Sequence, residues 1–325
     1  MPRSCHIALI CLTALLAPLA QSARAEDFPS RPITLIVQIP AGGPTDVAAR
    51  ILGSIAEKEL KQPIVIVNRV GAGGQLGTTE LARAKPDGYT IGFILPPTTN
   101  AQILTPARQT LYDEKSFAPI INHVIDAGVI WVRADSPYKS MKDLLEAAKK
   151  SPSTIRAATT GILSDDHFQI LMVEEAAGVK FRIVHLEGAA NQYKETLGGN
   201  VDVSFDNVGN VTKPAKAGLI RVLAVSDSQR SKFLPDVPTM KELGYPTVIS
   251  SSTRGLAAPK GTPKPIVDKL AQVFKRAMDN PDHAKRMADQ GLAVRPMMPD
   301  EFTRYWLNAH EQTKKHVEWA NKRPQ

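Results

Sequence analysis

Cysteine is nearly absent from this sequence. Its two cysteines, Cys5 and Cys11, lie within the first 25 of the 325 residues. This segment has an early arginine, an apolar run over residues 7–20 and a closing Ala23-Arg24-Ala25, which together predict a secretory signal peptide over residues 1–25. The apolar run is short for a membrane anchor, which is the alternative interpretation. Once the signal is removed, the exported protein can hold no disulfide, catalytic thiolate or cysteine-bound metal.

Tracts of one charge are absent as well. The chain has a formal net charge of +8, and the loss of Arg3 and Arg24 with the signal lowers it by two, to +6. No run of basic residues is longer than a pair, so we expect no nucleic-acid partner. The mild positive charge favours the approach of small anions.

The motifs of common enzymes are also missing. There is no G-x-S-x-G sequence for a serine nucleophile and no H-E-x-x-H pair for zinc. His167 follows two acidic residues, Asp165 and Asp166, at a predicted helix start, where it could cap the helix or face a cleft. His310 and His316 are predicted to be solvated on the last helix. We therefore expect no catalytic residue, no metal and no cofactor, with an enzyme as the minor alternative.

What the sequence does contain is a repeated alternation of strands and helices. The first strands are expected at residues 33–39, 63–68 and 89–95, separated by helical patterns. This order predicts a parallel sheet with right-handed crossovers. The alternation resumes from residue 128, and two helices close the chain, at residues 265–279 and 300–319. We predict an α/β fold with two mostly parallel sheets in two lobes and a ligand cleft between them: lobe 1 at residues 26–124 and 260–325, lobe 2 at residues 125–259.

Two glycine-rich loops follow the first two predicted strands. They read IPAGGPTD at residues 39–46 and RVGAGGQLG at residues 69–77, and each opens a predicted helix. A dinucleotide fingerprint would place its third glycine where Leu76 stands, and no P-loop lysine follows. Because neighbouring parallel strands end at the same edge, both helix N-termini should point at one spot and offer N–H groups to an anion. Two tight turns without a ligand are the alternative.

Three other polar positions are candidates for the same cleft. One is predicted at the end of the third strand, beside the glycine loops: Thr98, Thr99 and Asn100. Asp206 and Asn207 end another apolar strand, where they could face the cleft or cap a turn. Arg254 is the only charge in the segment SSTRGLAAP, and it could lie on the surface or clamp a ligand carboxylate.

An ordered series of motifs along the chain is similar to that of one family. The stretches FPSRPITLIVQIPAGGPTDVAAR, VNRVGAGGQLGTTELARAKPDGYT, LGGNVDVSFDN, PDVPTMKELGYP and GLAAPKGTP occur in this order. Through them the chain resembles the substrate-binding proteins of the tripartite tricarboxylate transporter family, the Bug-type receptors. The resemblance implies the periplasmic binding protein fold of the second type, a periplasmic location and a monomer. It also implies two kinds of partner, a small organic carboxylate and integral membrane permease subunits. A receptor that presents its ligand to a membrane sensor kinase is the alternative.

The resemblance also implies ligand-binding residues. In lobe 1 they come from the first glycine loop and, nearby, from the second: Ala41, Gly42, Gly43, Thr45, Asp46, Gly71, Ala72, Gly73 and Gly74. In lobe 2 they come from a G-x-x-S-x-x-H-like segment, the next loop and an aspartate at a strand end: Gly161, Ser164, His167, Gly188, Ala189 and Asp206.

Two segments depart from the pattern of this family. LEGA at residues 186–189 stands where the family usually has a Tyr-Lys-Gly-Ser-like loop, so that an aromatic and a basic residue are lost and Glu187 is gained. TRGL at residues 253–256 stands where a Trp-Tyr-Gly-Leu-like segment is usual, and Arg254 is new. We therefore hypothesise that Arg254 contacts the end of the ligand away from the glycine loops, for example a second carboxylate.

Overall fold

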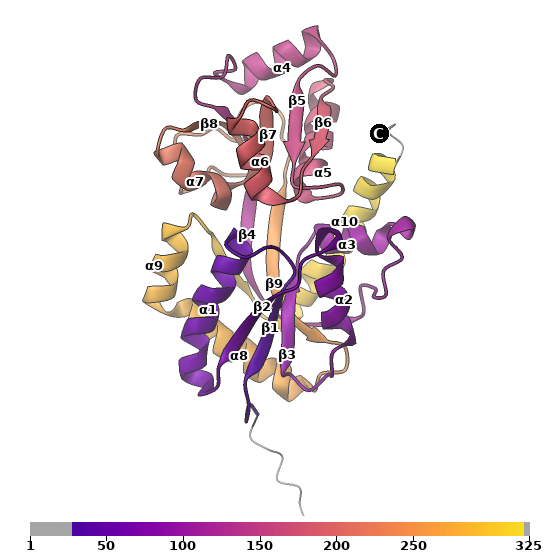
Figure 1. Cartoon of the computed structure of the whole chain (residues 1–325), viewed down its shortest axis with the longest axis vertical. Coiled ribbons are helices and arrows are strands. Elements are labelled where there is room, and N and C mark those ends of the chain that lie inside the picture. Colours follow the sequence, from indigo (N-terminus) through magenta and orange to yellow (C-terminus); the bar gives the residue numbers. More distant parts are fainter. Residues whose placement is uncertain (1–27, 322–325) are drawn as a thin grey trace, which may run out of the picture.

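The structure is a computed structural model that describes residues 28–321 of the chain. The predicted signal peptide at residues 1–25 lies outside this range. Figure 1 shows two α/β lobes stacked along the longest axis and joined by two long strands, β4 (Phe117–Arg133) and β9 (Ser251–Pro259). The predicted two-lobed α/β fold is confirmed.

Lobe 1 is built on a parallel sheet of three strands. Its central strand pairs on both sides in parallel, with Leu35 opposite Ile66 on one neighbour and Ile91 on the other. The strands are β1 (Ile33–Val37), β2 (Ile64–Asn68) and β3 (Thr90–Ile94), with β10 (Val294–Met297) added against β4. The helices are α1 (Pro44–Leu60), α2 (Gln75–Arg83), α3 (Thr98–Leu104), α8 (Lys264–Asp279), α9 (Pro281–Asp289) and α10 (Pro299–Asn321), with 3-10 turns η1 (Ala72–Gly74) and η2 (Pro106–Arg108).

Lobe 2 repeats this arrangement with its own parallel strands. β5 (Arg156–Thr159) pairs in parallel with β6 (Arg182–His185) and β7 (Val203–Asn207), and β8 (Ile220–Ser226) pairs antiparallel with β4. The helices are α4 (Met141–Lys150), α5 (Asp165–Ala177), α6 (Gly188–Leu197) and α7 (Val208–Lys216). Ser140 and Asp143 form the predicted capping box at the start of α4.

The two crossing strands belong to both lobes. The first half of β4 pairs antiparallel with β9 and its second half with β7 and β8. The expected lobe boundary between residues 124 and 125 therefore falls inside one continuous strand. Leu256 and Ala258, which were expected in lobe 2, instead pack in the core of lobe 1, because this part of β9 lies beside β3.

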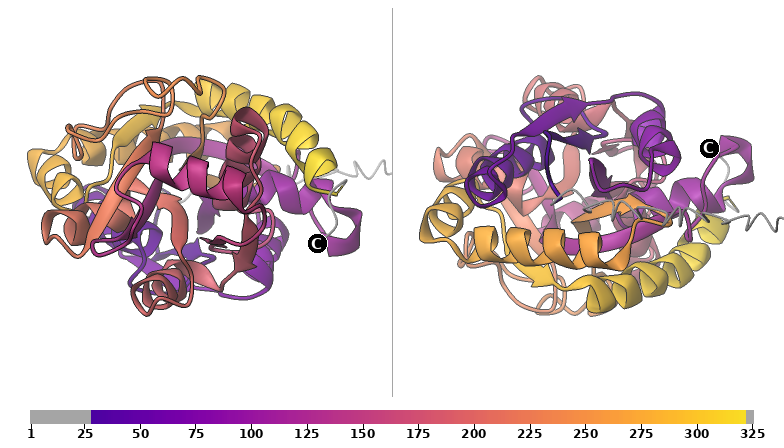
Figure 2. Two further views of the ribbon diagram at one scale, coloured as in Figure 1. Left: turned by 90° about the horizontal axis from the view of Figure 1, so that it is seen from above. Right: turned by 90° about the horizontal axis from the view of Figure 1, so that it is seen from below.

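Each lobe has its own apolar core, and a smaller cluster joins the lobes. The core of lobe 1 includes Leu35 and Phe274, and that of lobe 2 includes Ile170 and Phe205. In the joining cluster, Ala101 of α3 and Val317 of α10 pack with Phe168 of α5. The long helix α10 thus reaches from lobe 1 to lobe 2, and seen from below it runs beside α8 (Figure 2).

This packing corrects the prediction for the last helix. His310 was expected to be solvated, but it is buried, and His316 is half-buried with its ring 5.3 Å from that of Phe168. The reason is that α10 is covered along one side by both lobes. Within residues 28–321, none of the helices combines the length and the apolar character that a membrane span requires.

Candidate functional site

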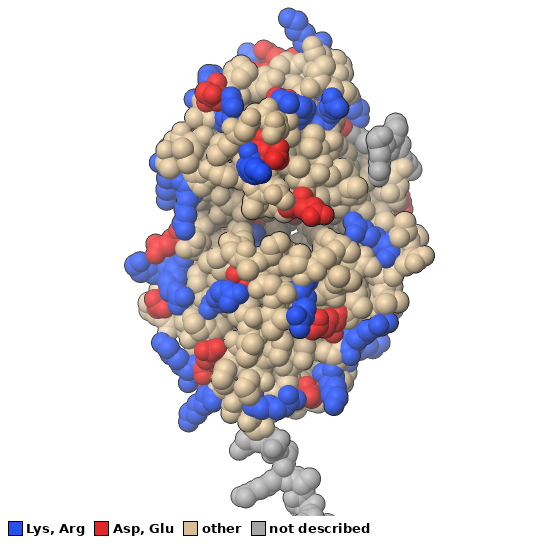
Figure 3. Space-filling model, in the orientation of Figure 1, with Lys and Arg blue, Asp and Glu red and all other residues tan. Residues whose placement is uncertain are grey.

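The candidate site lies where the two parallel sheets face each other. The carboxyl ends of β1, β2 and β3 point up toward lobe 2, and those of β5 and β6 point down toward lobe 1 (Figure 1). In the space-filling view, the surface is hollowed between the lobes at this level (Figure 3). In α/β sheets, ligands bind outside the carboxyl ends of the strands, next to helix N-termini.

The first glycine loop joins β1 to α1 as predicted. Gly43 is the N-cap of α1 and Pro44 occupies the first turn, so that the amides of the next residues, Thr45 among them, lie at the positive end of the helix. Gly42 is exposed and has φ of +84°, a left-handed conformation that favours glycine. A Cβ on Gly43 would meet no atom closer than 3.7 Å, so the space beside the loop is open.

Asp46 was expected at the ligand, but its carboxylate is occupied within the protein. It is buried and accepts hydrogen bonds from the Gly42 amide (2.9 Å), from Nε and Nη2 of Arg50 (2.9 Å each) and from Nδ2 of Asn68 (3.0 Å). Burial would raise the pKa of Asp46, but these hydrogen bonds, with that from Arg50 foremost, outweigh it and lower the pKa. Asp46 therefore shapes the first loop, while its amide lies in the first turn of α1.

The second glycine loop adopts a run of left-handed residues. Gly71, Ala72, Gly73 and Gly74 all have positive φ, from 50° to 143°. Gly71 is the N-cap of η1, which the other three residues form just before α2. The carbonyls of Ala72 and Gly73 accept hydrogen bonds from Arg108 Nη1 (3.1 Å) and Gln102 Nε2 (2.7 Å). Both carbonyl groups therefore have hydrogen-bond donors within the protein and need no partner from the cleft.

The polar segment after β3 is helical, which corrects the prediction of a strand end. Thr98, Thr99 and Asn100 form the first turn of α3, because the turn at Pro96 and Pro97 ends the strand early. The Thr99 hydroxyl accepts a hydrogen bond from the Leu95 amide (3.0 Å). Asn100 is fully buried, and its side-chain atoms have no hydrogen-bond partner among the described residues.

In lobe 2 the predicted Gly161-Ser164-His167 segment forms the turn between β5 and α5. Ser164 caps the helix by accepting a hydrogen bond from the His167 amide (3.2 Å). Nδ1 of His167 accepts one from the Leu163 amide (3.0 Å), and the side chain is 8% exposed. His167 therefore both supports the turn and lies at its inner edge.

A second histidine at this position was missed from the sequence. His185, the last residue of β6, is exposed and lies with its ring centroid 4.7 Å from that of His167. Its Nδ1 is 2.9 Å from Oγ1 of Thr159. Although the residue reaches the surface, its ring is partly desolvated, which lowers its pKa. In the sequence, the one sign that His185 could belong to the site was its place at a predicted strand end. Its contact with His167 could not be predicted, because that contact depends on the pairing of β5 with β6.

The loop after β6 leads directly into the next helix. Gly188 and Ala189 open α6, and Glu187 is its exposed N-cap residue without a side-chain cap. The Gly188 amide donates to the Thr160 carbonyl (3.4 Å), which ties this loop to the one after β5. Gly161 has φ of +146° and lies against the Leu186 carbonyl, 3.9 Å from its Cβ position.

Asp206 and Asn207 lie at the end of β7 as predicted, and both are buried. Oδ1 of Asp206 accepts hydrogen bonds from the amide of Asn207 (2.7 Å) and from Nδ2 of Asn210 (2.5 Å). Nδ2 of Asn207 donates to Oδ2 of Asp165 (2.9 Å). Burial raises the pKa of Asp206 to about 7.

Arg254 is buried, so the alternative of a surface residue is excluded. It is 3% exposed in β9, and its Nη2 lies 2.9 Å from Oδ2 of Asp126 on the neighbouring strand β4. Oδ1 of Asp126 in turn accepts a hydrogen bond from the Gly209 amide at the start of α7 (3.0 Å). Direct contact with a ligand stays a prediction, and in this structure the guanidinium lies between the crossing strands and α7, paired with Asp126 through Nη2.

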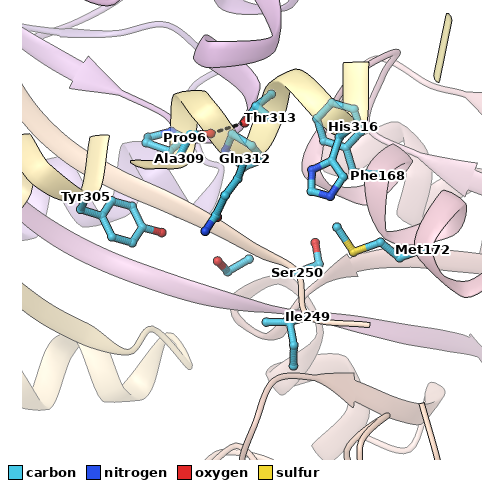
Figure 4. A pocket seen from close by; sticks show the side chains of 12 residues that line it. Pro96, Phe168, Met172, Ile249, Ser250, Tyr305, Ala309, Gln312, Thr313 and His316 are labelled. Atoms are coloured by element: carbon cyan, nitrogen blue, oxygen red, sulfur yellow. Dashed lines mark hydrogen bonds between the residues drawn. The ribbon is translucent and has the colours of Figure 1, made fainter. Parts of the chain in front are cut away.

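A small pocket lies on the α10 side of the crossing strands, away from the glycine loops. It holds about 100 Å³ and is lined by residues of both lobes and of α10, among them Phe168, Tyr305 and His316. Gln312 points into it (Figure 4). No lysine, arginine, aspartate or glutamate lines it. In the described part of the chain, no three histidine or acidic residues are grouped so that they could hold a metal ion.

Comparisons with known proteins agree with this geometry. A sequence model described as "tripartite tricarboxylate transporter family receptor" matches residues 48–321. The periplasmic binding protein BugD is 33% identical, with a TM-score of 0.81, over 92% of this chain and all of the BugD chain. MatC from Rhodopseudomonas palustris, solved with bound malate, is 29% identical with a TM-score of 0.81, over 89% of this chain and 100% of its own. A further R. palustris protein, solved with adipate, is 26% identical with a TM-score of 0.83, over 91% and 99%.

Proposed function

Because the chain belongs to the tripartite tricarboxylate transporter receptor family, whose members are periplasmic solute-binding receptors, we propose that it captures a small organic carboxylate between its lobes and delivers it to the membrane subunits of such a transporter. The observation that carries the proposal is the pair of glycine loops that end β1 and β2. Both loops open helices at one edge of the sheet, and relatives of the same fold hold malate and adipate.

The ligand carboxylate is proposed to bind the lobe 1 cradle, which we define as the turns from Ala41 to Thr45 and from Gly71 to Gly74. Main-chain N–H groups there meet the negative charge, as at other helix N-termini. A hydrogen bond to a charged group contributes about 1.5–3 kcal/mol, and a partly buried helix end adds up to about 2 kcal/mol. A few such contacts, less the cost of ordering the ligand, are sufficient for a micromolar or tighter dissociation constant, which corresponds to about 8 kcal/mol or more.

The opposite side of the proposed site is the lobe 2 wall, which we define as residues 159–167, 185–191 and 206–210. From this wall we retain Gly161, Ser164, His167, Gly188 and Ala189 as candidate ligand contacts and add His185. Thr98, Thr99 and Asn100 at the start of α3 and the buried Asp206 and Asn207 are proposed to support the contacts from behind.

Closure around the ligand is proposed to use the crossing strands as a hinge. β4 and β9 are the segments that pass through both sheets, so a change in their backbone angles would move one lobe against the other. The closed form would present a different surface from the open form, which a membrane partner can distinguish. Export by the predicted signal at residues 1–25 would place the receptor in the periplasm.

Thermal melting of the exported form against a panel of organic carboxylates, with nucleotides as the comparison, tests this function. We expect at least one carboxylate to raise the melting temperature in a concentration-dependent way. Gly43→Ala would place a methyl group beside the cradle and should weaken that stabilisation while leaving the melting temperature without ligand nearly unchanged. Stabilisation by a nucleotide and by no carboxylate would refute the proposal.

A further inference from the structure

The two sides of the proposed site differ in the charges at their helix N-termini. In lobe 1, α2 and α3 have no acidic residue in their first turn. Asp46 is the one acid in the first turn of α1, and it forms two hydrogen bonds with Arg50, both of 2.9 Å. The positive ends of these helices are therefore free to attract an anion from the cleft.

In lobe 2, each helix N-terminus already has acidic groups of its own. α5 begins with Asp165 and Asp166, and Glu187 immediately precedes α6. At α7, Asp126 accepts the hydrogen bond of the Gly209 amide, and Asp206 lies next to the N-cap residue. Carboxyl oxygens of Asp166, Asp206 and Asp126 accept backbone N–H groups at or beside these helix starts, so the lobe 2 wall has fewer free N–H groups with which to attract a second anion.

The lobe 2 wall also has no lysine or arginine that could attract a second anion despite these acidic groups. Residues 159–167, 185–191 and 206–210 contain no lysine or arginine. The buried cation behind the wall is Arg254, which Asp126 already contacts. Burial lowers the pKa of His185 at the wall, which disfavours the charged form of this ring. A second carboxylate placed here would meet acidic groups without an accessible counter-charge, which is unfavourable by several kcal/mol when like charges meet in an interface.

We propose that the lobe 2 wall selects a positively charged group, so that the ligand is an amino carboxylate, with its carboxylate on the lobe 1 cradle and its ammonium group near Glu187. This inference rests on the proposed function and narrows its substrate class. Glu187 is the exposed acid of the wall, at the carboxyl end of β6. In the first turn of α5, Oδ1 of Asp166 is buried and has no hydrogen-bond partner within the described residues, so this oxygen is available to a further hydrogen-bond partner.

The proposal predicts a specific order of affinities among matched ligands. Calorimetric titration would compare 4-aminobutyrate, succinate and butyrate, which share a four-carbon chain and differ in the group at one end, with the corresponding three-, five- and six-carbon sets and α-amino acids alongside. We expect the best amino carboxylate to bind at least about tenfold more tightly than the dicarboxylate and the simple acid of its length.

Variants of Glu187 separate recognition of charge from general effects. Glu187→Gln should weaken the affinity for the amino carboxylate by about tenfold and leave the affinity for the simple acid unchanged. Glu187→Lys should make the dicarboxylate the preferred ligand. Glu175→Gln, which neutralises an exposed acid further along α5, is the matched control and should change neither affinity.

The outcomes distinguish this inference from the proposed function. If a dicarboxylate or simple acid binds most tightly, or if Glu187→Gln and Glu187→Lys leave the order of affinities unchanged, the inference is wrong while the receptor function stands. If no carboxylate binds and a nucleotide does, both are wrong.

Discussion

Arg254 and Asp126 form a buried ion pair that joins the two crossing strands β9 and β4. Their side chains are 4% and 1% exposed, and the Nη2–Oδ2 distance is 2.9 Å. Arg254 contacts Asp126 through Nη2 alone. Its Nε and Nη1 have no hydrogen-bond partner within residues 28–321. Because Asp126 also holds the Gly209 amide, the pair connects β9, β4 and α7 at the point where the lobes meet.

Removal of one member of this pair should be strongly destabilising. Arg254→Met leaves a buried carboxylate without its counter-charge, and we expect it to lower the free energy of unfolding by about 3–5 kcal/mol. In the double variant Arg254→Met/Asp126→Asn, the neutral amide still accepts from Gly209 and part of the loss should be recovered. Urea unfolding of both variants measures this difference. A loss of less than about 1 kcal/mol in Arg254→Met would show that the pair contributes little.

The two glycine loops should respond differently to a single added methyl group. A Cβ on Gly77 would lie 2.7 Å from the carbonyl oxygen of Arg69, so Gly77→Ala must push α2 away from β2. We expect it to cost about 1–3 kcal/mol of stability and to displace the second loop. Gly43→Ala meets only ordinary contacts and should cost less than about 1 kcal/mol. Equal losses in the two variants, measured by denaturant unfolding, would contradict this reading of the loops.

A buried histidine pair should make the fold sensitive to acid. Nε2 of His123 on β4 lies 2.9 Å from Nε2 of His283 on α9. Burial lowers the pKa of His283 to about 4 and that of His123 well below its usual value. At these two histidines, the unfolded chain therefore binds more protons than the folded chain below about pH 6.5. Their contribution to the free energy of unfolding should fall as the pH decreases toward 4, by up to about 1.4 kcal/mol per pH unit for each histidine.

The double variant His123→Gln/His283→Gln isolates this effect. Buried aspartates with raised pKa values act in the opposite direction over the same pH range, and they are present in both proteins. The difference in unfolding free energy between wild type and variant, measured from pH 4.5 to 7.5, should therefore change with pH. A constant difference would exclude the histidine pair as the cause.

The charge state of Asp206 should make binding of an amino carboxylate depend on pH. Burial raises the pKa of this carboxyl group to about 7, so its negative charge develops as the pH rises through neutrality. A ligand ammonium group stays protonated in this range. We expect the affinity for the best amino carboxylate to increase by about three- to tenfold from pH 6 to pH 8. Titrations of Asp206→Asn over the same range should show a flat profile, and an unchanged slope in this variant would assign the pH dependence to another group.

The sequence by itself determined the elements and the first half of the site. The apolar runs of β1, β2 and β3 and the glycine loops after β1 and β2 are local features, because period, turn chemistry and capping act over a few residues. They were sufficient to predict parallel sheets, two lobes and an anion cradle at helix N-termini. The segment from Thr98 to Asn100 shows the limit of such patterns, since the turn at Pro96 and Pro97 moved it from a strand end into a helix.

Only the tertiary structure decided which distant residues share a space. Arg254 pairs with Asp126, which is 128 residues away in the sequence. His185 lies beside His167 because β5 and β6 pair in parallel. His310 became buried because α10 packs across both lobes. Burial and pairing depend on which surfaces meet after the chain has folded, and no local pattern encodes those contacts. For this protein, the sequence therefore predicted the glycine loops that we propose as the carboxylate cradle, whereas the fold determined which charged groups lie near them.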